Sequence, residues 1–131
     1  MTDHTEKYLA ATYATHVNDI DAFLQKPGVK IVQVTAPWCA KCVTIKQQIN
    51  EGLRAEFDDV DWMIVDLEEV EEASELLELS AMPRVDVVGS KTTHEGGTPR
   101  VTLEGFECNT EAVWKVVRAL HPPKLVLDED F

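Results

Sequence analysis

The sequence predicts an α/β fold in which helices flank both faces of a central mixed β-sheet. Short apolar runs rich in β-branched residues alternate with helical segments through most of the chain. Such an alternation requires parallel strands joined by right-handed crossovers. Near the end of the chain, a polar, glycine-rich stretch separates two further apolar runs and predicts a hairpin. The hairpin adds antiparallel strands, so the sheet should be mixed.

The first predicted elements precede a pair of close cysteines. Residues 14–17 are expected to form a short strand, and Asn18 is expected to cap a helix over residues 19–26. The Pro-Gly pair at residues 27–28 should end that helix. The apolar run at residues 29–36 is then expected to form a buried strand at the centre of the sheet.

A second helix is expected to begin at the two cysteines, Cys39 and Cys42. Apolar residues recur at every fourth position along it and predict one buried stripe, formed by Ile45, Ile49, Leu53 and Phe57. Lys46 is expected to lie largely off this stripe.

The second half of the chain predicts the remaining elements. Residues 61–67 should form a strand and residues 68–79 an acidic helix, with inward-facing side chains at Val70, Ala73, Leu76 and Leu77. Strands over residues 84–88 and 100–104 should flank the polar turn at residues 89–99. Gly105 should end the second of these strands. The last helix is expected over residues 111–120, with Asn109 or Thr110 as its N-cap.

Length and composition indicate one domain. The chain has 131 residues, of which 44% are hydrophobic, which suits a single domain with a buried core. We expect this domain to span residues 1–131, with residues 1–13 as an N-terminal extension and residues 121–131 as a loose acidic tail. No apolar run is long enough to cross a bilayer, and the N-terminus shows no targeting pattern. We therefore expect a cytoplasmic protein.

The net charge of −12 is concentrated in one segment. Residues 51–81 contain twelve acidic residues and one basic residue, a net charge of −11. Such a field repels nucleic acids and anionic lipid surfaces, so we expect neither as a partner. A well-solvated face is the simpler interpretation, and steering of basic partners is the alternative.

The cysteine pair indicates redox chemistry. Three cysteines are too few for a disulfide framework, and a close pair in a reducing compartment is more often catalytic or metal-binding than structural. At a helix N-terminus, free N–H groups and the helix dipole favour the thiolate of Cys39, and Lys41 adds a positive charge beside it. Two intervening residues make one helical turn, so Cys42 can attack a mixed disulfide at Cys39.

From about Ala14 to Leu120 the chain resembles the thioredoxin family. The segments that carry the resemblance are KIVQVTAPWCAKC, SAMPRVDVV and LEGF. A tryptophan directly before the first cysteine, here Trp38, and a proline that opens the strand after the third helix, here Pro83, are marks of that family. The resemblance implies the thioredoxin fold and reduction of protein disulfides by dithiol–disulfide exchange, with no cofactor and no metal.

The resemblance also implies roles for individual residues. Cys39 resembles the attacking cysteine, Cys42 the resolving cysteine, and Trp38 the ring that borders the sulfur. A target-binding surface is implied at Met82, Pro83, Arg84 and Gly105, with Pro83 in the cis form. Implied partners are disulfide-containing protein clients and either a reductase like thioredoxin reductase or a low-molecular-weight dithiol. We expect a monomer.

Two departures from the family pattern bear on redox tuning. Ala40 and Lys41 stand where the family usually has Gly-Pro, and the lysine should favour the thiolate and make the pair a weaker reductant. Gln33 replaces the usual buried acid, and Ile64 replaces the lysine that often pairs with it. Because both partners are lost together, no charge is left stranded. We expect slower or differently pH-dependent turnover, with Lys41 or water assisting.

Two other residues have open interpretations. Arg84 stands where the family prefers threonine, and it either contacts an acidic partner or is a solvated residue at a strand end. Cys108 is expected to be a partly buried bystander, with glutathionylation or dimer formation through this thiol as the alternatives.

Three other functions compete with disulfide reduction. A zinc site would need two ligands besides the pair, and no second close pair exists among Cys108, His4, His16, His94 and His121. Glutaredoxin-like activity, or an isomerase or oxidase with a more oxidising pair, is the closer alternative. A thioredoxin-like binding module that is not an enzyme is the third, and the intact cysteines argue against it.

Overall fold

The computed structural model describes residues 11–89 and 99–121. It contains a five-stranded sheet in the order β1-β3-β2-β4-β5. The strands are β1 (Thr12–Tyr13), β2 (Lys30–Thr35), β3 (Asp61–Asp66), β4 (Arg84–Val88) and β5 (Arg100–Glu104). β3 pairs in parallel with β1 and β2, whereas β4 is antiparallel to both β2 and β5. The predicted mixed sheet and its terminal hairpin are confirmed.

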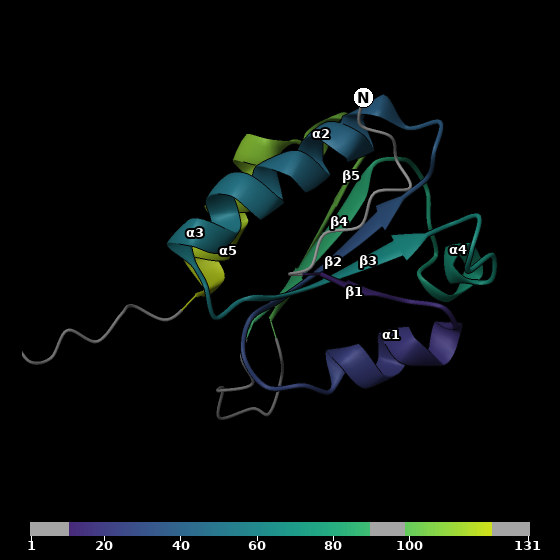
Figure 1. Ribbon diagram of the computed structural model, residues 1–131, viewed down its shortest axis with the longest axis horizontal. Helices are drawn as coiled ribbons and strands as arrows, with labels where there is room; N and C mark the ends of the chain where they lie inside the picture. The colour runs from purple at the N-terminus through teal and green to yellow at the C-terminus, as the bar shows by residue number, and fades with distance from the viewer. Residues whose placement is uncertain (1–10, 90–98, 122–131) are drawn as a thin grey trace, which may run out of the picture.

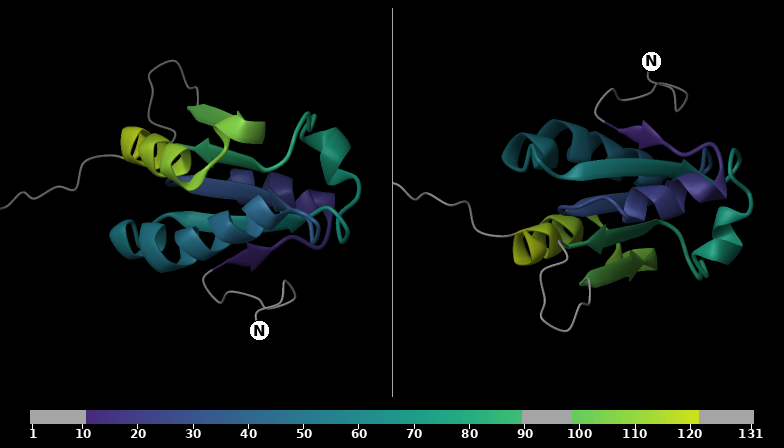
Figure 2. Two further views of the ribbon diagram at one scale, coloured as in Figure 1. Left: turned by 90° about the horizontal axis from the view of Figure 1, so that it is seen from above. Right: turned by 90° about the horizontal axis from the view of Figure 1, so that it is seen from below.

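Helices cover both faces of the sheet, as Figures 1 and 2 show. One face carries a long helical segment and the last helix, and the other carries two shorter helices. The long segment comprises α2 (Ala40–Gln48), the π-helical turn η1 (Ile49–Leu53) and α3 (Arg54–Glu56). The other helices are α1 (Val17–Leu24), α4 (Ala73–Leu76), the 3-10 turn η2 (Gly105–Glu107) and α5 (Thr110–Leu120). None of the helices within the described residues is long and apolar enough to cross a membrane.

β2 is the central strand, and every one of its residues is buried. Its alternate side chains belong to two cores, as the period of a strand requires. Ile31 packs in the core beneath α2 and α5, whereas Val32 and Val34 pack in the core beneath α1. A short loop leads from the end of this strand to α2 (Figure 1), so the cysteines follow a strand that is buried along its whole length.

The first two elements lie earlier in the chain than predicted. β1 falls within the expected N-terminal extension, and α1 begins at Val17 with His16, not Asn18, as its N-cap. The carboxylate of Asp19 accepts hydrogen bonds from the backbone N–H groups of Thr15 and His16, and the His16 ring accepts one from the Asn18 N–H. This reciprocal capping box satisfies backbone donors that would otherwise lack partners.

The long helical segment keeps the predicted apolar stripe. Ile45, Ile49 and Leu53 are buried in one core, and Phe57 packs against it. Lys46 lies off this stripe, but its side chain is buried as well, with 6% of its surface exposed. A lysine has a long apolar stem, which packs readily at such a position.

The acidic segment is less helical than predicted. Only Ala73–Leu76 forms an α-helix, and turns precede and follow it. One reason is local, since the Asp66 carboxylate accepts a hydrogen bond from the Glu68 N–H at 2.8 Å and stabilises a turn instead. Val70, Ala73 and Leu77 are buried as expected, but Leu76 is 44% exposed, so its predicted inward orientation is wrong.

The C-terminal part follows the prediction closely. Gly105 follows the last residue of β5, and Asn109 caps α5 by accepting a hydrogen bond from the Ala112 N–H at 2.9 Å. Val113 and Val117 of α5 are buried in the core. The predicted polar turn at residues 89–99 and the predicted tail at residues 121–131 lie largely outside the described residues.

Candidate active site

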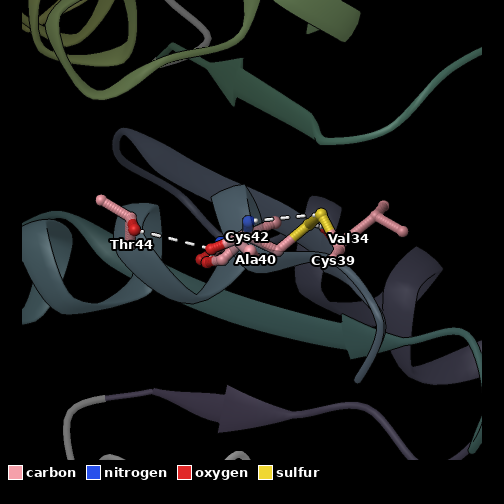
Figure 3. Close-up of a disulfide and its surroundings, with 6 residues drawn as sticks. Val34, Cys39, Ala40, Cys42 and Thr44 are labelled. Atoms are coloured by element: carbon pink, nitrogen blue, oxygen red, sulfur yellow. Dashed lines mark hydrogen bonds between the residues drawn. A yellow bond between two sulfur atoms is a disulfide. The ribbon is translucent and has the colours of Figure 1, made fainter.

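The two close cysteines lie at the start of α2, at the end of the sheet where β2 finishes. Their sulfur atoms are joined as a disulfide, and their Cα atoms are 5.3 Å apart (Figure 3). One helical turn between the two residues produces this approach, as the spacing predicts. The pair is therefore able to exist in a dithiol and a disulfide form.

The two cysteines have different environments. Cys39 is the N-cap of α2, and its Sγ accepts a hydrogen bond from the Cys42 N–H at 3.3 Å. Cys42 has no exposed surface, whereas 7% of Cys39 is exposed. Helix N–H groups that point at the first sulfur favour its anionic form. The geometry thus leaves Cys39 at the outer end of the pair and Cys42 behind it.

Gln33 fixes the backbone at the second cysteine. Its Nε2 donates a hydrogen bond to the Cys42 backbone oxygen at 3.0 Å, and its Oε1 accepts one from Trp62 Nε1 at 3.3 Å. Gln33 pairs with Ile64 across β2 and β3 and is fully buried. Both ends of the amide therefore have partners, and this position carries a hydrogen-bonding group that does not titrate.

The residues around the first cysteine are open to solvent. Trp38 exposes 67% of its surface directly before Cys39, and Ala40 and Lys41 are exposed in the first turn of α2. A large exposed aromatic ring is uncommon on a protein surface and is typical of contact sites.

A loop before β4 approaches the cysteines. Met82 packs against Cys39, Cys42 and Ala36, and the Met82–Pro83 peptide bond is cis, as the resemblance implied. The Gly105 N–H donates a hydrogen bond to the Pro83 oxygen at 3.0 Å. Gly105 has a φ of 65°, a conformation that favours glycine. The structure therefore brings Met82, Pro83 and Gly105 together beside the pair.

Arg84 lies beneath this loop and does not face solvent. Only 5% of its surface is exposed, so the alternative of a solvated strand-end residue is wrong. Its guanidinium donates two hydrogen bonds to Asp86, one to the Leu77 oxygen and one to Glu104. Because these donors are occupied within the protein, the side chain supports the loop from inside and does not present a charge to a client.

The ion pairs around Arg84 form a network within the sheet. Burial alone would raise the pKa of Asp86, but hydrogen bonds from Arg84 and Arg100 hold it below its ordinary value. The Glu104 carboxylate also accepts a hydrogen bond from the Ser80 N–H at 3.0 Å. The network therefore connects β4 and β5 to the segment that leads into Pro83.

Cys108 is separate from the pair. It has no exposed surface, and burial raises the pKa of its thiol to about 11. Cys108 therefore lies in the core, fully buried where partial burial was expected, and its role as a bystander stays a prediction. Within the described residues, no group of three or more histidine, cysteine or acidic side chains is arranged to hold a metal ion.

Two residues near the site were missed by the sequence reasoning. Phe106 follows Gly105 and exposes 87% of its surface, and its position directly after the glycine could have indicated it. Lys46 is buried on α2 four residues after Cys42. That spacing puts the two side chains on one helix face, which was a usable signal.

Comparison with known families identifies one match over most of the chain. The thioredoxin family model matches residues 9–106. A comparison with curated protein sequences gives no match.

Solved structures with the same fold are thioredoxins from several organisms. Mitochondrial thioredoxin 3 from Saccharomyces cerevisiae in its oxidised form has a TM-score of 0.68 at 20% identity, covering 84% of this chain and 95% of that chain. Thioredoxin O2 from Arabidopsis thaliana has a TM-score of 0.68 at 21% identity, covering 86% and 96%. Thioredoxin from Plasmodium falciparum has a TM-score of 0.65 at 23% identity, covering 82% and 97%.

Proposed function

Since the chain belongs to the thioredoxin family, we propose that it reduces disulfide bonds in client proteins by dithiol–disulfide exchange at Cys39 and Cys42. The observation that carries the proposal is the asymmetric pair at the N-terminus of α2. Cys39 there retains 7% of its surface exposed and its sulfur accepts a helix N–H, whereas Cys42 is fully buried. A nucleophile and a resolving thiol need this arrangement.

The reaction proceeds in two exchanges. The Cys39 thiolate attacks one sulfur of a client disulfide, the client S–S bond breaks, and the departing client thiolate takes a proton from solvent. Cys42 then loses its proton and attacks Cys39 Sγ, which releases the second client thiolate. The client gains two electrons and two protons, and the pair becomes the disulfide seen in Figure 3.

Clients are proposed to bind across the loop and ring that border Cys39. Trp38 supplies an exposed aromatic surface, and Met82 lies against the sulfurs. Pro83 and Gly105 bring two backbone segments close together, so that an extended client segment can lie beside Cys39. Phe106 extends this surface beyond the glycine, since most of its ring is exposed.

The proposed partners are disulfide-containing proteins and a reductant that restores the dithiol. That reductant is either a reductase of the thioredoxin reductase type or a small dithiol, and the protein acts as a cytoplasmic monomer. These proposals rest on the family and on the single reactive pair.

A more oxidising role, as an isomerase or oxidase, is supported by one feature of the motif. Lys41 is exposed in the first turn of α2, beside the position where Cys39 becomes a thiolate. A neighbouring positive charge stabilises the reduced thiolate form and raises the reduction potential. We expect a potential above the roughly −270 mV of ordinary thioredoxin, and titration against glutathione measures it.

Insulin reduction with dithiothreitol as electron donor tests the main proposal. The wild-type protein should accelerate precipitation of the insulin B chain, and Cys39→Ser and Cys42→Ser should each abolish the acceleration. Cys108→Ser is the matched control and should remain active, because this thiol is buried away from the pair. Full activity in Cys39→Ser would overturn the proposal, whereas glutathione-dependent reduction of a small disulfide would favour the glutaredoxin-like alternative.

A further inference from the structure

Lys46 lies on the same face of α2 as Cys42. The two residues are four positions apart, both are buried, and side chains at this spacing are neighbours on a helix. Helix side chains also lean toward the N-terminus, so the stem of Lys46 extends over the turn that contains Cys42. Lys46 and Cys42 are therefore neighbours on one buried face of the helix.

Lys46 also lines a cavity of about 360 Å³ at the carboxyl ends of the parallel strands. Pro37, two residues before Cys39, and Thr35, at the end of β2, line it as well. The titratable groups that surround Lys46 and the sulfur pair from neighbouring elements are Tyr13, Asp66, Glu68, Glu69, Cys39 and Lys41. The cavity therefore lies beside both Lys46 and the loop that leads into Cys39.

The charge of Lys46 is not used elsewhere in the described part of the chain. Among those residues the Lys46 side chain donates no hydrogen bond and forms no ion pair, and the charge of Asp66 acts on it from beyond ion-pair distance. Burial lowers the pKa of Lys46, and the charge of Asp66 opposes this shift. An ammonium without a close acceptor interacts strongly with any new anion nearby.

Other buried polar groups do not suit this role. Gln33 contacts the Cys42 backbone but carries no charge. Lys30 lies at the opposite end of β2, where its ammonium donates hydrogen bonds to the Lys26 and Gly28 oxygens. Arg84 is held by Asp86 on β4. Among these buried cations, Lys46 is therefore the one closest in the chain to the resolving sulfur.

We propose that Lys46 is a positioning residue whose charge stabilises the Cys42 thiolate and so sets the pH dependence of the resolving exchange. This inference rests on the proposed function. In the mixed disulfide, the Cys42 thiol releases its proton to solvent, and the Lys46 ammonium stabilises the thiolate that remains. The thiolate electron pair forms the bond to Cys39 Sγ, the bond from Cys39 to the client sulfur breaks, and the client thiolate takes a proton from solvent.

Single-turnover reaction with dithiobis(nitrobenzoate) separates the two exchanges. Attack by Cys39 releases one nitrothiobenzoate, and attack by Cys42 on the mixed disulfide releases the second. Both releases are followed by absorbance in a stopped-flow instrument across a range of pH, in a Cys108→Ala background. The variants are Lys46→Met, which keeps the stem and removes the charge, and Lys46→Gln, which keeps a polar end.

The proposal predicts that the pH midpoint shifts in the second exchange alone. In both Lys46 variants the pH midpoint of the second release should rise by about one unit or more, so its rate near neutral pH should fall about tenfold per unit. The midpoint of the first release should not change. Lys30→Met is the matched control for loss of a buried lysine and should leave both midpoints unchanged.

The outcomes distinguish this inference from the proposed function. If both Lys46 variants fold, as judged by circular dichroism, and keep the wild-type midpoint for the second release, the inference is overturned while the proposed function stands. If the wild-type protein gives no first release, the proposed function fails and this inference fails with it. An equal shift of both midpoints would indicate a general structural effect and would also overturn the inference.

Discussion

The side-chain amide of Gln33 donates a hydrogen bond to the backbone oxygen of Cys42 at 3.0 Å, from the central strand to the helix that carries the pair. The same amide accepts a hydrogen bond from the Trp62 indole at 3.3 Å. A neutral side chain thus fixes the helix against the sheet without adding a charge beside the resolving sulfur. Gln33 therefore holds the helix in place, and any charge that acts on the resolving sulfur comes from another residue.

Loss of this amide should destabilise the protein. Gln33→Leu fills a similar volume but removes the hydrogen bonds that the amide makes to the Cys42 oxygen and to the Trp62 indole. Because a typical hydrogen bond contributes about 0.5 to 1.5 kcal/mol, we expect a loss of about 1 to 3 kcal/mol in the free energy of unfolding. Urea denaturation measures it. Trp62→Phe removes only one of the two bonds, and a larger loss there than in Gln33→Leu would contradict this account.

Gln33→Asp should change the pH dependence of catalysis. The substitution places a titratable carboxyl in the position that now holds an amide, close to the Cys42 backbone. A buried carboxylate disfavours a nearby thiolate and also exchanges protons with it. Insulin reduction measured from acidic to alkaline pH should therefore give a displaced profile, and identical rates at every pH would show that this position has no electrostatic role.

Removal of Arg84 should weaken the protein and make it more sensitive to acid. Arg84→Met leaves the buried Asp86 with Arg100 as its remaining cation, and we expect a loss of about 3 kcal/mol or more in unfolding free energy. The pKa of Asp86 is lowered in the folded protein, so its stabilising effect is present above about pH 4 and is lost as the pH falls through the folded pKa. Without Arg84 that pKa rises, and the loss should begin at a higher pH.

Urea midpoints measured between neutral and acidic pH test this prediction. Arg118→Met is the matched control, because Arg118 forms an exposed ion pair with Glu56 and should contribute far less. Equal losses in the two variants would contradict the role assigned to the buried network.

Gly52→Ala should be poorly tolerated in the π-helical turn. A Cβ atom at this position would overlap the six-membered ring of Trp114, which packs there from α5. Overpacking of this kind costs about 1 to 3 kcal/mol. Thermal unfolding of the single and double variants measures the effect. Combining Gly52→Ala with Trp114→Phe removes the overlapping ring atoms. The double variant should therefore lose less stability than the two single variants lose together, and strict additivity would count against the contact.

Cys108 should not react with alkylating reagents in the folded protein. With a thiol pKa of about 11, only roughly one thiol in a thousand is ionised at pH 8. After reduction, iodoacetamide should therefore modify Cys39 first and leave Cys108 unmodified until denaturant is added. Mass spectrometry of the peptides measures both reactions, and early modification of Cys108 in the native protein would show that this thiol is accessible.

Sequence reasoning predicted most of the fold because strands and helices here have clear periodicities. β2, β3, β4 and β5 lie where their apolar runs predict them, and the stripe through Ile45, Ile49 and Leu53 is buried. The short first strand and the acidic segment were harder. The carboxylates of Asp19 and Asp66 accept backbone hydrogen bonds that decide the local structure there, and neither residue produces a periodic pattern.

The site was predictable where local spacing determines the geometry. The cysteine pair needs only one helical turn, and the cis bond at Pro83 followed from the family resemblance. The environment of Arg84 was not predictable, because its partners Leu77 and Glu104 come from two other segments. The burial of Lys46 depends on how tightly α2 packs against the strand ends, which the sequence pattern does not specify.

The position of β2 in the middle of five strands has a consequence for local unfolding. Strands at the edges of a sheet open more often than the centre, and β1 contains only two residues. The cysteines follow directly from the strand whose amide hydrogens should exchange most slowly with deuterium. Opening of either edge would therefore leave the two sulfurs within bonding distance, and the pair should still close its own disulfide through partial denaturation.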